Sequence, residues 1–246
     1  MHDRHGNAIP WPMPRAAAPV VVDAAAPVAI PAGATTIAGR LWLPPTPRAL
    51  YVLGHGAGAG MHHRFMVAIA GALAERAIAT LRWEMPAMTA GRRLADRPAV
   101  VRPLARAACV HAAALAPGLP LVAGGKSMGG RMTSEAQAAA PIPGLRGLAF
   151  LGFPLHPAGA PAIARAAHLA AIALPMLFVS GDRDALATPA LLAGVVAELG
   201  PRARLRVIPG ADHGLDVPAR SGVDPIALAA DELAAWAGAL PGPALP

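Results

Sequence analysis

The chain has 246 residues, of which 55% are hydrophobic and 14% are charged, which suits a folded domain with a large core and excludes a wholly disordered chain. Its formal net charge is +7, but the basic residues are dispersed, all except Lys126 are arginines, and aromatic residues make up only 4% of the chain, so no nucleic-acid partner is expected. The apolar run 169–179 is far shorter than the roughly 18 residues of a membrane span, so we expect no membrane partner. No secretion signal is recognisable, and the single Cys109 cannot form an intramolecular disulfide. We therefore expect a cytoplasmic location.

The first segment of the chain differs in character from the rest. Residues 1–31 are rich in proline and alanine without periodicity, and we predict an extended or partly disordered arm there. Residues 32–246 show regular patterns, with no internal repeat and no break in composition. They are predicted to form one domain.

Short apolar runs alternate with amphipathic segments along this domain. Such runs predict strands, and apolar residues at helical spacing predict helices. The strands are expected at 36–43, 50–53, 78–83, 119–123, 147–151, 176–179 and 204–208. The helices are expected at 64–75, 129–140, 188–199 and 225–236, and one more helix is expected to run through Val110 and Leu115. This alternation predicts an α/β fold with a doubly wound, mostly parallel sheet covered on both faces.

The central motif is Gly-Lys-Ser-Met-Gly at residues 125–129, which matches G-x-S-x-G. It lies between an apolar strand and a helix, where a strained turn exposes the serine and glycines let neighbouring elements approach. The helix N-terminus also supplies amide hydrogens for developing negative charge. We interpret Ser127 as a candidate nucleophile.

A second glycine-rich turn follows the strand at 50–53 and reads His-Gly-Ala-Gly at residues 55–58. One interpretation is a plain turn. The other is half of an oxyanion hole, in which the backbone N–H of Ala57 joins that of Met128. We favour the second interpretation because a candidate nucleophile accompanies the turn.

A serine nucleophile requires a base and an orienting carboxylate. Asp184 and His213 follow two later predicted strands, at the sheet edge where α/β proteins place their sites. Each could instead be an ordinary polar loop residue. Asp182 and Asp212 are further candidates for the acid, although Asp182 is better placed to cap a turn and Asp212 is adjacent to the histidine.

Two other motifs suggest nucleotide binding. Gly-Lys-Ser at 125–127 resembles the end of a P-loop, but the glycine that this motif requires five residues earlier is Pro120. Residues 54–59 come closer to a dinucleotide fingerprint, with Glu84 as its later acidic residue. That interpretation leaves the serine, aspartate and histidine unexplained.

The octet Gly-Gly-Lys-Ser-Met-Gly-Gly-Arg at 124–131 resembles the corresponding turn of bacterial α/β-hydrolases distantly related to dienelactone hydrolase, a group that includes testis-expressed eukaryotic relatives. Four further segments resemble the group, at 54–58, 82–93, 152–157 and 168–184. The resemblance implies Ser127 as nucleophile, Asp184 as acid and His213 as base. Dienelactone hydrolases proper carry cysteine at the turn, so Ser127 favours ester-type acyl transfer instead.

Together these features predict a single-domain α/β-hydrolase fold without a large cap, because only about 20 residues separate Phe153 from the strand at 176–179. We expect a serine hydrolase that acts on a small-molecule acyl substrate and uses neither cofactor nor metal. The alternative is a non-catalytic interaction scaffold with the same fold. The roles of His62, His63, His156 and His168, and the oligomeric state, stay open at this stage.

Overall fold

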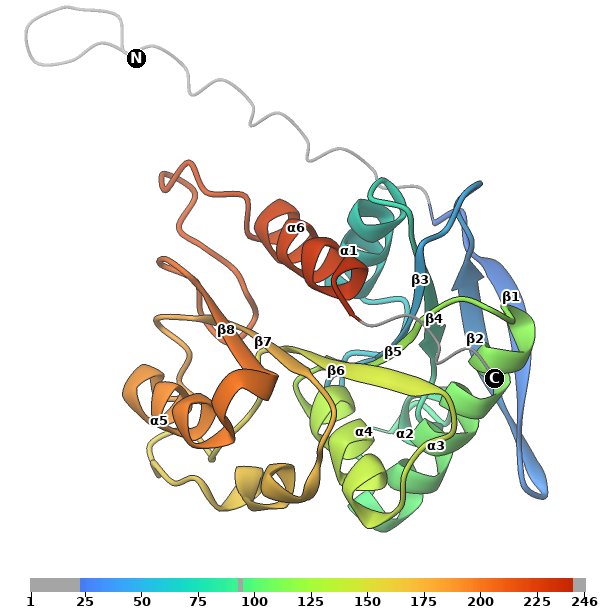
Figure 1. The fold of residues 1–246 in the computed structure, drawn as a ribbon, viewed down its shortest axis with the longest axis horizontal. Coiled ribbons are helices and arrows are strands. Elements are labelled where there is room, and N and C mark those ends of the chain that lie inside the picture. The colour runs from blue at the N-terminus through green and yellow to red at the C-terminus, as the bar shows by residue number, and fades with distance from the viewer. Residues whose placement is uncertain (1–22, 93–94, 241–246) are drawn as a thin grey trace, which may run out of the picture.

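The structure is a computed structural model that describes residues 23–92 and 95–240. Eight strands, six α-helices and two short 3-10 helices make up the described part of the chain (Figure 1). In chain order they are β1 (Ala26–Ala32), β2 (Thr35–Trp42), β3 (Ala49–Gly54), α1 (Arg64–Ala74), β4 (Ile78–Trp83), α2 (Pro86–Thr89), α3 (Pro98–Leu115), β5 (Leu121–Lys126), α4 (Met128–Ala139), β6 (Leu145–Leu151), η1 (Ala164–Ala171), β7 (Met176–Gly181), α5 (Pro189–Leu199), η2 (Gly200–Arg202), β8 (Ala203–Ile208) and α6 (Pro225–Gly238).

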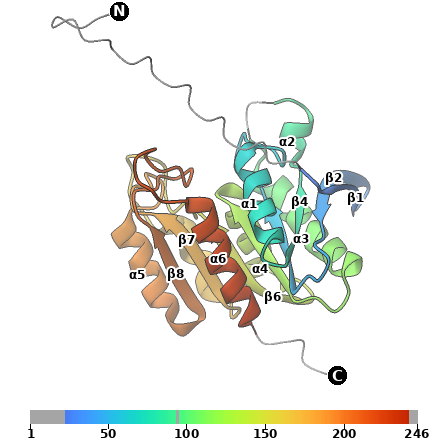
Figure 2. The ribbon, with the colours of Figure 1, turned by 90° about the horizontal axis from the view of Figure 1, so that it is seen from above.

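All eight strands form one sheet, in the order β1-β2-β4-β3-β5-β6-β7-β8. The pairs β1–β2 and β2–β4 are antiparallel and every other pair is parallel. Figure 2 shows β1 and β2 at one edge and β8 towards the other. The predicted doubly wound, mostly parallel sheet is therefore confirmed.

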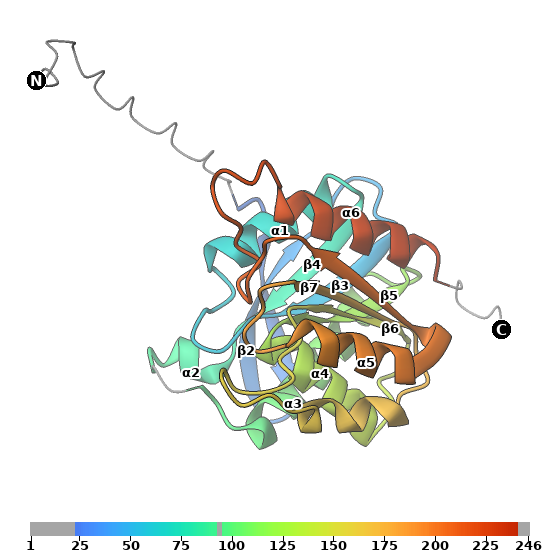
Figure 3. The same ribbon diagram turned by 90° about the vertical axis from the view of Figure 1, so that its left-hand side faces the viewer.

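Helices cover both faces of the sheet. α1 and α6 pack together on one face, whereas α3, α4 and α5 lie on the other (Figure 3). Two apolar clusters fill the layers between the helices and the sheet, one on each face. The central strands β3 and β5 are buried along their whole length, which explains why their sequences are nearly continuous apolar or glycine runs. Among the described residues, no helix has both the length and the apolar character needed to cross a membrane.

The predicted arm ends earlier than the sequence suggested. Residues 26–31 belong to strand β1, which pairs with β2 along its whole length. Proline is tolerated there because β1 is an edge strand, and an edge strand needs ladder hydrogen bonds on one side only. Residues 1–22 of the predicted arm lie outside the described residues.

The strand before Ser127 ends later than the predicted range of 119–123. Gly124 and Gly125 continue strand β5, so the turn falls at Ser127 itself. Their φ values of 146° and 133° are ones that glycine adopts far more readily than other residues. The pattern did not reveal the short helix α2 or the 3-10 helix η1. Between Phe153 and β7, η1 is the only described helix, and it packs against α4 and α5, so no large cap domain is inserted there.

Candidate active site

Ser127 occupies a strained turn between β5 and α4. Its φ of 49° and ψ of −113° lie outside the regions that non-glycine residues favour. Its N–H donates to the carbonyl of Leu151 on β6 at 3.1 Å, and its carbonyl accepts from the N–H of Arg131 at 3.1 Å. The turn is therefore held at both ends, and the hydroxyl is presented at the carboxyl edge of the sheet.

Glycines make this turn possible by removing side chains where two backbones meet. A Cβ on Gly125 would lie 2.1 Å from the carbonyl oxygen of Gly54, and one on Gly129 would lie 2.3 Å from the Gly54 carbonyl carbon. No side chain fits at either distance. The two flanking glycines of the motif are thus required by the close approach of β3, as the sequence pattern predicted.

His213 links Ser127 to Asp184. Its Nε2 lies 2.8 Å from the Ser127 hydroxyl oxygen, and its Nδ1 lies 2.9 Å from each carboxylate oxygen of Asp184. The three residues follow β5, β7 and β8, whose carboxyl ends share one edge of the sheet. The structure therefore brings together the three residues that the sequence singled out.

Asp184 is held as an anion. Its side chain is fully buried, and burial by itself raises the pKa of the carboxyl. The hydrogen bond from His213, the charges of His213 and Lys126, and the N–H of Leu186 at 2.8 Å outweigh burial, so the net pKa is lowered. A carboxylate at this place fixes the imidazole with Nδ1 protonated and leaves Nε2 free to accept the serine proton.

The other two candidate carboxylates serve loops instead. Asp182 accepts a hydrogen bond from the N–H of Gly210 at 2.7 Å, and Asp212 accepts one from the N–H of Asp216 at 3.1 Å. Neither forms a hydrogen bond with His213 in the part of the chain that the structure describes. Geometry thus favours Asp184 as the partner of the histidine.

The loop that carries Ala57 lies beside Ser127. A Cβ placed on Gly56 would be 3.7 Å from the Ser127 Cβ. No acceptor for the Ala57 N–H is found within residues 23–92 and 95–240, and the Met128 N–H stands at the first position of α4, where a helix leaves amides unpaired. Both amides are therefore available to a ligand next to the serine.

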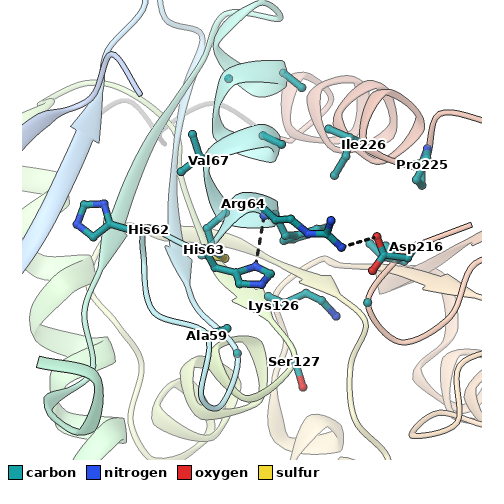
Figure 4. Close-up of a pocket in the computed structure, with 18 of the residues that line it drawn as sticks. Ala59, His62, His63, Arg64, Val67, Lys126, Ser127, Asp216, Pro225 and Ile226 are labelled. Atoms are coloured by element: carbon teal, nitrogen blue, oxygen red, sulfur yellow. Dashed lines mark hydrogen bonds and ion pairs between the residues drawn. The ribbon is translucent and has the colours of Figure 1, made fainter. Parts of the chain in front are cut away.

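A groove leads from Ser127 along α1 and the start of α6. The cavity has a volume of about 1610 Å³, and apolar side chains such as Phe65 and Ile226 make up much of its wall. At its mouth an exposed ion pair joins Arg64 to Asp216 at 3.5 Å (Figure 4). The serine thus lies in a wide groove, and among the described residues no lid closes over it.

A family model described as "Alpha/beta hydrolase domain" matches residues 47–238. The chain belongs to the α/β-hydrolase family. Membership supports a hydrolase, and it confirms the superfamily that the octet at residues 124–131 suggested. No curated protein sequence matches the chain.

Solved structures with the same fold include other α/β-hydrolases. The dienelactone hydrolase of Anabaena variabilis has a TM-score of 0.69 and 18% identity, over 86% of this chain and 95% of that one. An esterase domain from Rhodothermus marinus has a TM-score of 0.67 and 18% identity, over 88% of this chain and 98% of that one. A serine hydrolase without a lid from Xanthomonas campestris has a TM-score of 0.67 and 19% identity, over 90% of this chain and 97% of that one. At such identities the likeness establishes the fold alone.

The dinucleotide interpretation of residues 54–59 is wrong for this α/β-hydrolase. A dinucleotide fingerprint opens a helix directly, so that the phosphates meet its N-terminus, whereas here α1 begins only at Arg64. The Glu84 carboxylate also has partners within the protein already. It accepts a hydrogen bond from the N–H of Met61 at 3.2 Å and lies 2.9 Å from Nε2 of His55. Nδ1 of His55 in turn donates to the Gly56 carbonyl at 2.7 Å. Glu84 and His55 therefore brace the loop that carries Ala57, a role that the sequence pattern did not reveal.

Lys126, the residue before the serine, is buried beside the site although the sequence analysis gave it no role. Its Nζ donates to the main-chain carbonyl of His213 and lies 5.7 Å from the centre of the Phe65 ring. Burial, as the largest cause, lowers its pKa to about 8, against the attraction of Asp184, Asp212 and Asp216. Its being the only lysine of the chain, inside the nucleophile motif, was the one signal that could have drawn attention to it.

Replacing Lys126 with methionine should change how stability depends on pH. Because the folded-state pKa lies below the unfolded value of about 10.4, the unfolded chain binds more protons between roughly pH 8 and pH 10.4. The lysine therefore destabilises the fold fully below pH 8, and this cost disappears as the pH rises through that window, at up to about 1.4 kcal/mol per pH unit. Denaturant unfolding of both proteins at pH 7, 8, 9 and 10 measures the difference. If the difference in the free energy of unfolding between the wild type and the variant is the same at every pH, the lowered pKa of Lys126 is contradicted.

The adjacent histidines lie at the groove. His63 is the N-cap of α1, where its Nδ1 accepts the N–H of Phe65 at 3.3 Å. The side chain of His62 is 58% exposed and points away from His63 (Figure 4). Within the described residues, neither forms a hydrogen bond with Ser127 or His213.

The remaining two candidate histidines have structural partners. His156 is buried; its Nδ1 donates to the Pro157 carbonyl at 2.8 Å and its Nε2 accepts the N–H of Thr188 at 3.1 Å. It therefore braces the turn after β6. His168 on η1 lies 2.8 Å from the hydroxyl of Ser134 on α4, on the face of the sheet opposite α1 and α6.

Proposed function

We propose that this α/β-hydrolase is a serine hydrolase that cleaves ester-type bonds of a small-molecule substrate through an acyl-enzyme. The observation that carries the proposal is the continuous chain of contacts from the Ser127 hydroxyl through His213 to Asp184, at 2.8 Å and 2.9 Å. The groove supports it, because largely apolar walls next to the serine suit the carbon chain of an acyl substrate.

In the proposed mechanism, Nε2 of His213 takes the Ser127 proton as the serine oxygen attacks the acyl carbonyl carbon. The carbonyl oxygen becomes an oxyanion, which accepts hydrogen bonds from the amides of Ala57 and Met128. His213 then gives the proton to the departing alkoxide, and the ester C–O bond breaks. Water attacks the acyl-enzyme with His213 again as base, which releases the acid and restores the serine.

Asp184 and α4 complete the proposed arrangement. The Asp184 carboxylate stabilises the imidazolium that forms at each step and keeps its ring orientation. The N-terminal end of α4 carries a partial positive charge, which favours the oxyanion at the Met128 amide. The strained backbone at Ser127 is held by two hydrogen bonds, one from its N–H to the Leu151 carbonyl and one from the Arg131 N–H to its own carbonyl, both at 3.1 Å.

Labelling with a fluorophosphonate probe tests the proposal directly. Such probes phosphonylate a serine only when a neighbouring base activates it. We expect the wild-type protein to be labelled at one site and the Ser127→Ala protein to remain unlabelled, with mass spectrometry of the peptide identifying the site. Absence of labelling in a folded wild-type protein would favour the non-catalytic scaffold instead, and labelling at another serine would overturn the assignment.

A further inference from the structure

A second cavity lies on the opposite face of the sheet from the groove, between α3, α4 and η1. It has a volume of about 650 Å³. Arginines from all three helices line it: Arg102 from α3, Arg131 from α4 and Arg165 from η1. The rest of the wall is formed by Glu135, His168 and a set of alanines, namely Ala138, Ala139, Ala164, Ala167 and Ala171.

The three arginines are poorly compensated. Arg131 pairs with Glu135, the one carboxylate of the cavity, at 2.7 Å through Nη1, while its buried Nε has no partner among the described residues. Arg102 makes a single contact of 3.3 Å with the main-chain carbonyl of Pro98. In the part of the chain that the structure describes, the Arg165 guanidinium forms neither an ion pair nor a hydrogen bond.

The electrostatics show a local excess of positive charge. Burial, as the largest cause, lowers the pKa of Arg131, and the charge of Arg165 lowers it further, against the attraction of Glu135. Burial and then the charge of Arg131 lower the pKa of His168 to about 4. His168 is therefore neutral near pH 7, and its Nε2 is occupied by Ser134. Three arginines and one carboxylate line the cavity, so its positive charges are not balanced, and a bound anion would offset their mutual repulsion.

We propose that Arg102, Arg131 and Arg165 form a binding site for the phosphate group of a small molecule. Guanidinium groups offer paired N–H donors that match phosphate oxygens, and they keep their charge when partly buried. The alanines give the cavity a smooth apolar wall against which a short carbon chain can lie. The site is separate from the groove at Ser127, and it does not depend on the proposed hydrolase activity.

Direct binding measurements at constant ionic strength test this site. We expect inorganic phosphate to bind the full-length protein saturably at a single site, with a dissociation constant in the millimolar range or below. The variant Arg165→Gln should weaken binding roughly tenfold or more, because it removes a charge-assisted contact. It should leave the thermal midpoint in phosphate-free buffer unchanged or slightly higher, since this guanidinium has no described partner to lose and its repulsion of Arg131 is removed.

The matched controls are Arg220→Gln and Ser127→Ala. Arg220 is exposed and does not line the cavity, and Ser127 lines the groove and not this cavity, so both variants should bind phosphate as the wild type does. A short alkyl phosphate that binds more tightly than inorganic phosphate would assign the site to phosphate monoesters, and weaker binding would assign it to the free ion. Absence of saturable binding, or equal weakening in Arg165→Gln and Arg220→Gln, would overturn the proposal.

Discussion

Replacing Ser127 with alanine should lower kcat for a short activated ester by roughly 10³-fold or more. The hydroxyl that lies 2.8 Å from His213 would be missing, so no acyl-enzyme could form. The backbone should not change, because alanine keeps the Cβ and meets the same φ of 49°. Steady-state kinetics and the thermal midpoint, measured on the same preparations, give both quantities.

The control for this substitution is Ser221→Ala. Ser221 lies in an exposed loop, where its hydroxyl accepts the N–H of Val223 at 3.2 Å and forms no other hydrogen bond with the described residues, so its removal should leave kcat within about twofold. If Ser127→Ala retained activity within about tenfold of the wild type, the proposed nucleophile would be wrong. A large loss accompanied by a collapse of the thermal midpoint would show unfolding, in which case probe labelling decides the role.

Replacing Asp184 with asparagine should lower kcat by orders of magnitude, whereas Asp182→Asn should have a much smaller effect. Asp184 accepts the Nδ1 hydrogen of His213 at 2.9 Å. An amide at this place can donate its own hydrogen to Nδ1, which puts the ring proton on Nε2 and removes the base. Asp182 instead caps a loop through the N–H of Gly210 at 2.7 Å, and the asparagine oxygen can still accept that hydrogen bond.

The two aspartates form a matched pair, because both follow β7 and both substitutions remove one negative charge. For Asp182→Asn we expect a loss of stability of at most about 1 kcal/mol, with kcat little changed. Measuring kcat and the thermal midpoint of both variants gives the ranking. The opposite ranking in kcat would transfer the role of the acid to Asp182.

Much of the site could be predicted because strand order along the chain constrains where loops lie. Ser127, Asp184 and His213 each follow a predicted strand, and the carboxyl ends of parallel strands meet at one edge of a sheet. The spacing of the glycines around Ser127 predicted a close approach of neighbouring elements. The structure shows that a Cβ at Gly125 or Gly129 would clash with the backbone of Gly54. Less could be predicted for the proline-containing strand β1, since its position at the sheet edge is a property of the whole sheet.

The sequence by itself determined the α/β alternation, the turn that carries the candidate nucleophile and the order of the three candidate catalytic residues, because these depend on local patterns and on one general property of parallel sheets. Only the tertiary structure decided which aspartate reaches His213, that Lys126 contacts the main chain 87 residues away, and that Arg102, Arg131 and Arg165 share one cavity. Those contacts join elements far apart in the chain, and no periodicity records the packing of one helix against another. Their energies depend on burial and on distances between charges, which exist only once the chain is folded.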